Sequence, residues 1–362
     1  MSYNILAINP GHNGSACLLV DGEIKFYIEE ERLSRLKYDG NPFRGMLEAI
    51  STHEIHELVI GGTGQGEVHQ LPWTGETSYG ALVRKYWPNV KVTYQWDKHH
   101  LGHAAGAFYN SGFDSAVAIV VDGSGSRTLF STGENQQPIS AFETESVYEC
   151  KYPATFNTVF KSFGNNDSHR FHNDEFIIDS AVSVTKAYEG VSHYLGFGFI
   201  EAGKTMGLSS YGTHDDDIGQ LFFNDRGDKN KFIPQYPAGS LIDQDRNPYL
   251  KKTEDAENNL WHKDPTKVSP AMQNLAWQIQ EESQEKVGDL IQKAIEKTGS
   301  KNVVIAGGYG LNCVANYYYL KRFPDVNIFV DPVSHDGGSA IGLAKLSWFE
   351  YCKENDIDVV KQ

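Results

Sequence analysis

The feature that most constrains the fold is a strand, a polar glycine-containing loop and a second strand, a pattern that occurs twice. In the first copy, strands at 4–9 and 15–20 flank the loop PGHNG, and a DG turn leads into a third strand at 23–30. The second copy begins at 115–122, where SAVAIVVD leads through GSGSR into the strand-like TLFST. Two such hairpins facing each other across a cleft can present backbone N–H groups to the phosphates of one nucleotide. Ordinary hairpin turns also explain the pattern.

Composition bounds the protein class. With 362 residues, of which 40% are hydrophobic, the chain can bury a large core and form two lobes. The formal charge of −15 disfavours nonspecific duplex binding by the whole surface and leaves open only a local basic groove. The first residues run directly into an apolar strand, and no apolar run is long enough to span a bilayer. Four dispersed cysteines without a CxxC pair form neither a thiolate metal site nor a disulfide framework, so we expect a cytoplasmic protein.

Three segments organise the second half of the chain. The sequence from about 213 to 268 is polar, and we interpret it as an insert or long loops. A long helix follows, with Ser269-Pro270 as N-cap and first-turn pair and Gly299 at its end. The strand-like NVVIAGG then brings Gly307-Gly308 to the start of another helix, an arrangement that suits an anion but is common in α/β proteins.

The sharpest local signal lies in DKHHLGHAAGAF. His99 and His103 are four residues apart in a segment that favours a helix, so both imidazoles fall on one face and can chelate one metal ion. Asp122 ends an apolar strand, and Asp336 precedes a helix in SHDGGSAIG, so both are expected to face the cleft. Two imidazoles with two carboxylates suit Fe(II), Mn(II) or Zn(II) and leave positions open for a phosphate or substrate oxygen.

Each of these residues also has a structural explanation. Two hydrogen-bonded helix histidines and two turn or N-cap aspartates would give the same pattern without a metal. His12, in the first hairpin loop, would lie across the cleft from the glycine pair, where it could orient a carbonyl or accept a hydroxyl proton. A turn histidine in contact with water fits its position equally well.

Together these stretches resemble the O-carbamoyltransferases of the NodU/CmcH/TobZ type, which modify antibiotics and nodulation factors. The resemblance covers nearly all of the chain and resides in motifs that occur in family order. These motifs are NPGHNGSACLLVDGEI, IEEERLSRLKYDG, HHLGHAAGAFYNSGF, EAGKTMGLSSYG, AGGYGLNCVAN and SHDGGSAIG.

The resemblance extends to the catalytic domain of the tRNA threonylcarbamoyl transferase, and it implies a fold and a site. The implied fold is α/β, a duplicated actin-like (ASKHA) fold with two lobes around a nucleotide and metal cleft. Residues 1–110 would begin the first lobe, including the His-x-x-x-His helix, and 111–362 would form the second lobe with the polar insert. The implied metal ligands are His99, His103, Asp122 and Asp336.

The implied reaction moves a carbamoyl group from carbamoyl adenylate, made from carbamoyl phosphate and ATP with Mg, to an acceptor hydroxyl. The implied metal is Fe(II), with Mn or Zn as alternatives, and His12 matches the histidine near the carbamoyl group. Tyr309-Gly310 departs from the small apolar pair that is usual in the nucleotide motif. The residues that match nucleotide-contacting motifs are Lys204, Gly307, Gly308 and Asn312.

The acceptor is less determined, because family members modify sugars, aminoglycosides, other small hydroxyl compounds and, in some viral cases, hydroxymethylated bases. Segments 161–176 and 224–252 mix aromatic and basic residues, which could stack on and hold a nucleic-acid acceptor. The net negative charge of the chain argues against such an acceptor. Arg32, Arg35 and Lys37 could bind an acceptor or phosphate, or form a solvated basic face.

Typical family members continue into a YrdC-like domain that makes carbamoyl adenylate, and this domain is absent from the present sequence. The domain could act in trans, the sequence could be truncated, or activated carbamoyl could come by another route. The proposed activity is also compatible with assembly of the chain into a homo-oligomer. The alternative functions are an actin-fold kinase or phosphotransferase, which the histidine pair disfavours, and a noncatalytic nucleotide-binding scaffold.

Overall fold

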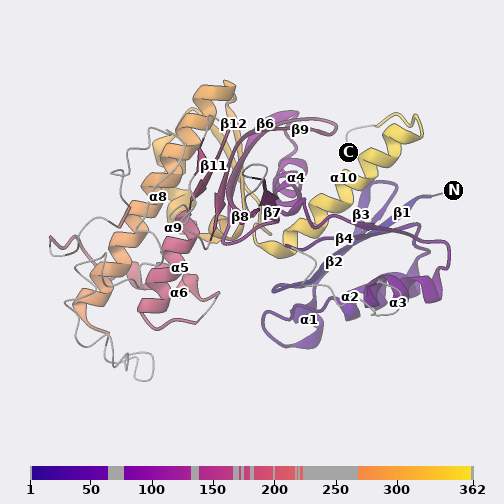
Figure 1. Ribbon diagram of the computed structural model, residues 1–362, viewed down its shortest axis with the longest axis horizontal. Coiled ribbons are helices and arrows are strands. Elements are labelled where there is room, and N and C mark those ends of the chain that lie inside the picture. The colour runs from indigo at the N-terminus through magenta and orange to yellow at the C-terminus, as the bar shows by residue number, and fades with distance from the viewer. Residues whose placement is uncertain are drawn as a thin grey trace.

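The chain folds into two mixed sheets, each in its own half of the molecule, with two helices between them (Figure 1). The computed structural model describes residues 2–63, 77–131, 138–165, 171–172, 175–179, 183–198, 200–216, 218, 221–222 and 268–359. Most of the polar insert expected at 213–268 therefore lies outside the described residues.

The first sheet confirms the three-strand meander that the N-terminal sequence predicts. Its strand order is β3-β2-β1-β4-β5, with β1 antiparallel to β2 and parallel to β4. Asp21 and Gly22 both have positive φ, 50° and 81°, as a two-residue hairpin turn requires. Helices pack on both faces of β1, which explains why all its residues are buried. The strands are β1 (Asn4–Asn9), β2 (Ser15–Val20), β3 (Glu23–Glu29), β4 (Glu57–Ile60) and β5 (Lys91–Tyr94).

The second sheet repeats the first and confirms the duplication. Its order is β10-β11-β9-β8-β6-β12-β13, so β9-β8-β6-β12-β13 corresponds to the whole first sheet in order and direction. The strands are β6 (Ser115–Val121), β7 (Arg127–Phe130), β8 (Ile139–Lys151), β9 (Thr155–Gly164), β10 (Phe171–His172), β11 (Phe176–Asp179), β12 (Asn302–Ala306) and β13 (Asn327–Val330).

One detail of the predicted repeat is wrong, because the stretch after GSGSR does not form a hairpin with the strand before it. Strand β7 instead continues along β8, on the same edge as β6. The intervening loop stays bonded to β8, since the N–H of Asp122 donates to the carbonyl of Thr144 at 3.0 Å and that of Gly125 to the carbonyl of Glu143 at 2.8 Å. The loop is thus an interruption within one long strand, and Asp122 lies where this interruption begins.

The helices form an outer layer on each sheet. In the second half, α8 begins at the N-cap Ser269 and ends at Gly299, which has a φ of 69°, so both predicted caps are confirmed. Within the described residues, no helix combines the length and apolarity needed to cross a membrane. The outer helices are α1 (Glu30–Ser34), α2 (Phe43–Thr52), α3 (Ser78–Tyr86), α5 (Val184–Tyr194), α6 (Ala202–Ser209), α8 (Pro270–Thr298) and α9 (Cys313–Arg322).

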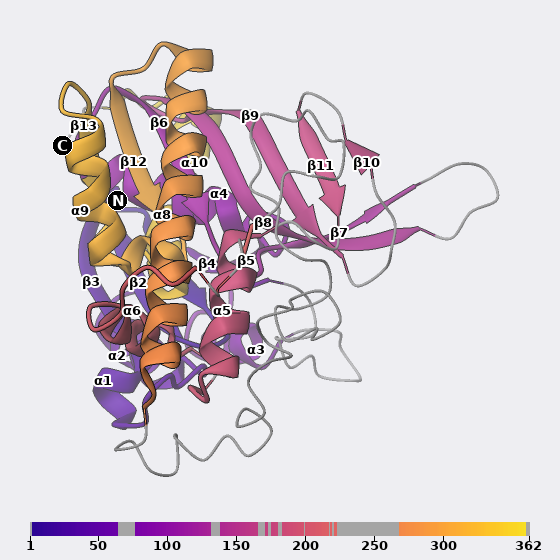
Figure 2. The same cartoon turned by 90° about the vertical axis from the view of Figure 1, so that its left-hand side faces the viewer.

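Helices α4 (His99–Ser111) and α10 (Ser339–Glu354) lie between the two sheets, and α10, which follows the last strand of the second sheet, crosses back to pack on the first (Figures 1 and 2). Helix α4 contacts β6 and β12, while the C-terminal α10 contacts β1 and β2. The two helices also touch each other through glycine: a Cβ placed on Gly342 would lie 1.9 Å from the carbonyl oxygen of Gly102 and 2.6 Å from the nitrogen of Gly106. This backbone contact holds the two halves together.

We expect Gly342→Ala to destabilise the protein by about 3 kcal/mol or more, because the new methyl group would meet backbone that has no rotamer to change. The matched control is Gly207→Ala in α6, where nothing lies within 4 Å of the added Cβ. That change should stabilise by up to about 1 kcal/mol through helix propensity. Urea unfolding of both variants measures the difference, and equal stability of the two would contradict the packing argument.

Candidate metal centre and ligand cavity

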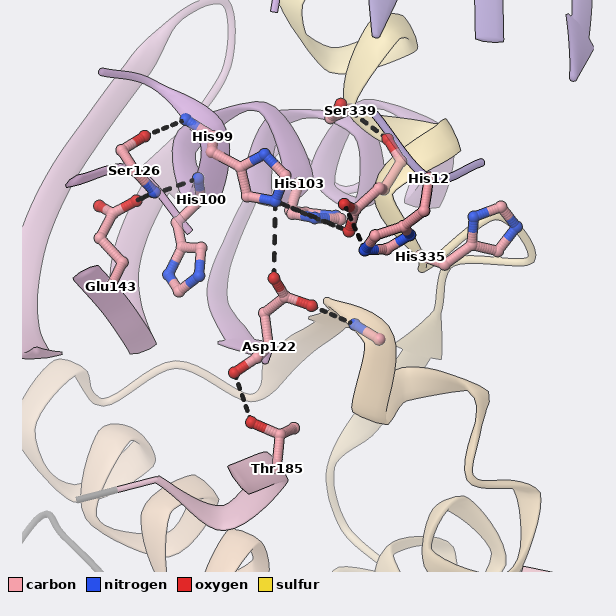
Figure 3. A network of polar contacts seen from close by, with 12 residues as sticks. His12, His99, His100, His103, Asp122, Ser126, Glu143, Thr185, His335 and Ser339 are labelled. Carbon is pink, nitrogen blue, oxygen red and sulfur yellow. Dashed lines mark hydrogen bonds and ion pairs between the residues drawn. The ribbon is translucent and has the colours of Figure 1, made fainter. Parts of the chain in front are cut away.

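The N-terminus of α4 is fixed by side chains of the second sheet (Figure 3). The N–H of His99 donates to Oγ of Ser126 at 3.0 Å, and the N–H of His100 donates to the carboxylate of Glu143 at 3.4 Å. Ser126 lies in the loop that interrupts the β6–β7 strand, and Glu143, on β8, is ion-paired with Lys161. These contacts satisfy helix N–H groups that would otherwise be unpaired and set the rotation of α4.

The four residues predicted as metal ligands come together at this point. The Nε2 atoms of His99 and His103 lie 3.1 Å apart, and carboxylate oxygens of Asp122 and Asp336 lie 3.5 and 3.7 Å from Nε2 of His99. One potential ligand atom from each residue falls within 4.8 Å of all the others, and all four residues are buried. His12 adjoins the cluster, with its Nε2 3.3 Å from Asp336.

Both aspartates are held in place by neighbouring backbone or hydroxyl groups, Asp122 through its carboxylate and Asp336 through its backbone carbonyl. Asp122 accepts a hydrogen bond from the N–H of Gly308 at 2.8 Å, and its backbone carbonyl accepts one from the hydroxyl of Thr185 at 2.5 Å. Asp336 opens the short helix η5 (Asp336–Gly338) just before α10, and its carbonyl accepts from the hydroxyl of Ser339 at 2.7 Å. The α4–α10 crossing therefore brings Asp336 to the histidine pair.

Electrostatics in the cluster favour positive charge between the carboxylates. Burial alone raises the pKa of Asp122 and of Asp336, yet the imidazoles beside them hold both values well below the ordinary range. Burial likewise lowers the pKa of His99, but the two carboxylates outweigh it and raise that pKa well above its usual value. The neighbouring His100 lacks such a balance, and burial lowers its pKa to about 4, so its ring is neutral.

The donor set fits a divalent ion. Nitrogen and oxygen ligands about 2.1 Å from one ion lie about 3.0 to 3.4 Å apart, close to the separations of 3.1 to 3.7 Å found here. The Nδ1 of His99 is buried without a hydrogen-bond partner among the described residues, so packing and the helix orient this ring. Two imidazoles and two carboxylates suit Fe(II), Mn(II) or Zn(II).

The two aspartates of the cluster form part of the wall of a cavity of about 410 Å³, a size in the range of small-molecule sites. Its apolar side is formed by α6 and the segment before it, and its polar side by the loops that follow β1, β6 and β12. The residues that line it include His12, Asn13, Tyr38, Asp122, Gly123, Ser124, Lys186, Glu189, Ile200, Gly203, Met206, Gly308, Tyr309, Leu311, Asn312, His335 and Asp336.

Comparison with known proteins identifies the family. A family model described as Carbamoyltransferase N-terminus matches residues 76–345, which is most of the chain. The chain belongs to this carbamoyltransferase family. Nodulation protein NolNO of Sinorhizobium fredii is 25% identical over 365 residues, covering 92% of this chain and 46% of that protein. The uncharacterized protein sll1178 of Synechocystis is 24% identical over 383 residues, covering 94% of this chain and 56% of that protein. The chain thus spans about half the length of the curated relatives it matches.

The carbamoyltransferase chain also resembles solved structures of low sequence identity. Full-length HypF in the phosphate- and nucleotide-bound form superposes with a TM-score of 0.55 at 12% identity, covering 99% of this chain and 56% of that one. HypF of T. kodakarensis superposes with a TM-score of 0.52 at 14% identity, covering 96% of this chain and 48% of that one. These likenesses confirm the actin-like α/β fold with two sheets that the sequence resemblance implies.

The four residues predicted to contact the nucleotide occupy different environments in this carbamoyltransferase family member. Gly308 and Asn312 line the cavity, although the Gly308 N–H is bonded to Asp122 and the Asn312 side chain caps α9 and pairs with Gln280. Gly307 lies behind the wall, with a φ of 89°. Lys204 is not among the described lining residues, and its ammonium lies 2.6 Å from Glu201. Their role in nucleotide binding stays a prediction.

The segments predicted to suit nucleic acid contribute little described surface. Lys161 is turned inward to Glu143, and residues 166–170, 173–174 and 224–252 lie outside the described residues. In the basic cluster of the first lobe, Lys37 is exposed and its ammonium lies 4.7 Å from the ring centroid of Tyr38. Tyr38 itself lines the cavity, and its hydroxyl donates to the carbonyl of Ile200 at 3.3 Å across the two halves.

Several residues of the site carry no sequence signal that singles them out. Ser126 and Glu143 orient α4, and His335 lines the cavity while its Nδ1 accepts from the N–H of Gly337 at 3.1 Å. Lys186 lies on the cavity wall in a helix whose sequence, VTKAYEGVSHY, shows no motif. Glu143 and Lys186 lie far in sequence from the clustered residues, so only the folded arrangement relates them to the cluster, whereas His335 directly precedes Asp336 and Ser126 follows Asp122 by four residues.

We expect His103→Gln to lower the affinity for Fe(II) or Mn(II) at least about 100-fold, because one of four ligands is lost without a large change in volume. The matched control is His214→Gln, an exposed histidine beside Asp216 that belongs neither to the cluster nor to the described lining of the cavity. Metal content after dialysis against a weak chelator measures both variants. Stoichiometric metal in the first variant would contradict the ligand assignment.

Proposed function

We propose that the chain catalyses transfer of a carbamoyl group from carbamoyl adenylate to an acceptor hydroxyl, and that the donor forms from carbamoyl phosphate and ATP. The observation that carries this proposal is the position of His12 beside a buried His₂Asp₂ cluster in the wall of one cavity, in a carbamoyltransferase-family chain. The phosphate and nucleotide described for the HypF structure of similar fold support a nucleotide in this cleft.

The cluster would hold a divalent ion, for which we propose Fe(II) with Mn(II) and Zn(II) as alternatives. When bound, such an ion supplies positive charge that stabilises the phosphate of the donor and of the departing AMP. In the proposed complex the adenylate occupies the cavity with its nucleoside toward the apolar wall, which includes Ile200, Met206 and Leu311. The carbamoyl group then lies at the end of the cavity nearest His12.

His12 is suited to accept a proton. Its Nδ1 lies 3.0 Å from Oδ1 of Asn13, an oxygen that only accepts, so Nδ1 carries a hydrogen. Its Nε2 lies 3.3 Å from Oδ2 of Asp336 and would be the nitrogen that accepts a hydroxyl proton once that carboxylate is drawn to a bound ion. Burial lowers the pKa of His12, but the carboxylate of Asp336, the hydrogen bond to Asn13 and the charge of Asp122 together outweigh burial and raise the pKa above its ordinary value. A raised pKa makes Nε2 a stronger base toward a hydroxyl proton.

The proposed step balances as a simple displacement at the carbamoyl carbon. The acceptor hydroxyl oxygen bonds to that carbon, and the bond from the carbon to the phosphate oxygen breaks. AMP leaves with the electron pair of this bond, and the hydroxyl proton passes to Nε2 of His12. We propose a small hydroxyl compound as the acceptor, with a hydroxymethylated base of nucleic acid as the second acceptor class to be tested.

We expect His12→Asn to reduce carbamoyl transfer at least about 100-fold, because the proton acceptor is removed. The same variant should bind metal as the wild type does, since His12 is not one of the four clustered residues. Transfer rate and metal content, measured on the same preparation, separate loss of chemistry from loss of the site. Full turnover of the variant would remove His12 from the mechanism.

The reaction itself is tested with isotope-labelled carbamoyl phosphate, ATP and Fe(II), offered with sugars, aminoglycosides and hydroxymethylcytosine-containing nucleic acid. One arm includes a separately purified YrdC-like domain, and mass spectrometry follows the label. Label in an acceptor is the expected result, and dependence on the added domain would locate activation in trans. Phosphorylated acceptor with ADP would instead identify a kinase. Nucleotide binding without any transfer in either arm would favour a scaffold.

A further inference from the structure

Lys186 is the one lysine or arginine among the described residues that line the cavity. The other charged side chains there are acidic, namely Asp122, Glu189 and Asp336, and the remaining cationic groups are histidines. A nucleotide brings at least one phosphate with negative charge into this acidic surrounding. A permanent cation on the wall is therefore the group that can offset that charge.

The ammonium of Lys186 lies against the loop that follows β6. A Cβ placed on Gly123 would meet the Lys186 Nζ at 4.0 Å, with no other described heavy atom within that distance. Gly123 directly follows Asp122, one of the four clustered residues. The ammonium and the cluster thus border the same part of the cavity, and a phosphate between them would contact both.

The helix that carries Lys186 is docked onto the cluster. The hydroxyl of Thr185, at the start of α5, donates to the backbone carbonyl of Asp122 at 2.5 Å (Figure 3). Two N–H groups of this first turn are already used, because that of Val184 donates to Glu145 at 2.7 Å and that of Lys186 donates to Ser183 at 3.0 Å. The Lys186 side chain is the one cationic group that the described part of α5 presents to the cavity.

The present partner of Lys186 can be exchanged. Its Nζ lies 2.7 Å from the carboxylate of Glu189, one turn further along the helix, and the two side chains are 32% and 28% exposed. An ion pair so open to water is weak, so a phosphate with more negative charge can compete for the ammonium. Glu189 holds Lys186 on the cavity wall until a ligand arrives.

We infer that Lys186 binds the phosphate of the nucleotide in this cavity. The inference deepens the proposed function and rests on it, because it takes the cavity to be the nucleotide site. It also differs from the sequence-based expectation for Lys204, whose ammonium is paired with Glu201 and is outside the described lining of the cavity. Both lysines sit on helices beside the same cavity, so they form a matched pair for a test.

The test compares AMP with adenosine, which lacks the phosphate, by calorimetric titration with the same divalent ion present throughout. Lys186→Gln should weaken AMP binding about tenfold and leave adenosine binding unchanged, because only the phosphate contact is lost. Lys186→Arg should restore most of the AMP affinity, and Glu189→Gln should tighten AMP binding by removing the competing carboxylate. Lys204→Gln is the competing variant, and the inference requires it to weaken AMP binding less than Lys186→Gln does.

Equal AMP affinity in Lys186→Gln and wild type would overturn the inference, as would equal losses for AMP and adenosine. Selective loss of AMP binding in Lys204→Gln alone would assign the phosphate to that lysine. A separate titration with carbamoyl phosphate distinguishes the phosphate of that compound from the phosphate of the nucleotide. If Lys186→Gln weakened the binding of carbamoyl phosphate but not of AMP, the assignment to the nucleotide would be overturned.

The two proposals fail separately. If AMP binding depends on Lys186 but the labelled-carbamoyl assay detects no transfer, the proposed function is wrong and the phosphate site stands. If transfer occurs and Lys186→Gln matches the wild type in AMP affinity and turnover, only the inference about Lys186 is wrong. Metal content of each variant confirms that the neighbouring cluster is intact.

Discussion

The arrangement of this site depends on the glycine contact between α4 and α10. Gly102 and Gly106 on one helix meet Gly342 on the other at distances that leave no room for a methyl group. Because α4 packs on the second sheet and α10 on the first, this single crossing joins the halves that carry the cluster. The histidines lie at the start of α4 and Asp336 lies just before α10, so the crossing fixes their separation.

Around that crossing, charge is balanced locally. Two buried carboxylates remain ionised because the imidazoles beside them oppose the cost of burial, and the Gly308 N–H donates to Asp122. The N–H groups of glycine loops in such a cleft commonly donate hydrogen bonds to a phosphate, but the Gly308 N–H instead orients the Asp122 carboxylate. Because this N–H is already bonded, side chains such as that of Lys186 must offset the negative charge of a bound phosphate.

Much of the fold could be predicted from local pattern. The first meander, the capped helix α8 and the duplication follow from alternation, turn chemistry and caps, which act over a few residues. The hairpin after β6 was predicted wrongly, because whether TLFST pairs backward or continues along β8 depends on a strand that comes later in the chain. The four clustered residues were named from spacing and resemblance, whereas Ser126, Glu143 and Lys186 depend on tertiary contacts that no local pattern encodes.

The most direct measurement of the central claim is anomalous diffraction from crystals grown with Mn(II) or Fe(II) and AMP, with data collected on both sides of the metal absorption edge. The account predicts one strong peak about 2.0 to 2.3 Å from Nε2 of His99 and His103 and from carboxylate oxygens of Asp122 and Asp336, facing the cavity. Metal bound elsewhere, with these four side chains joined only by hydrogen bonds, would contradict it.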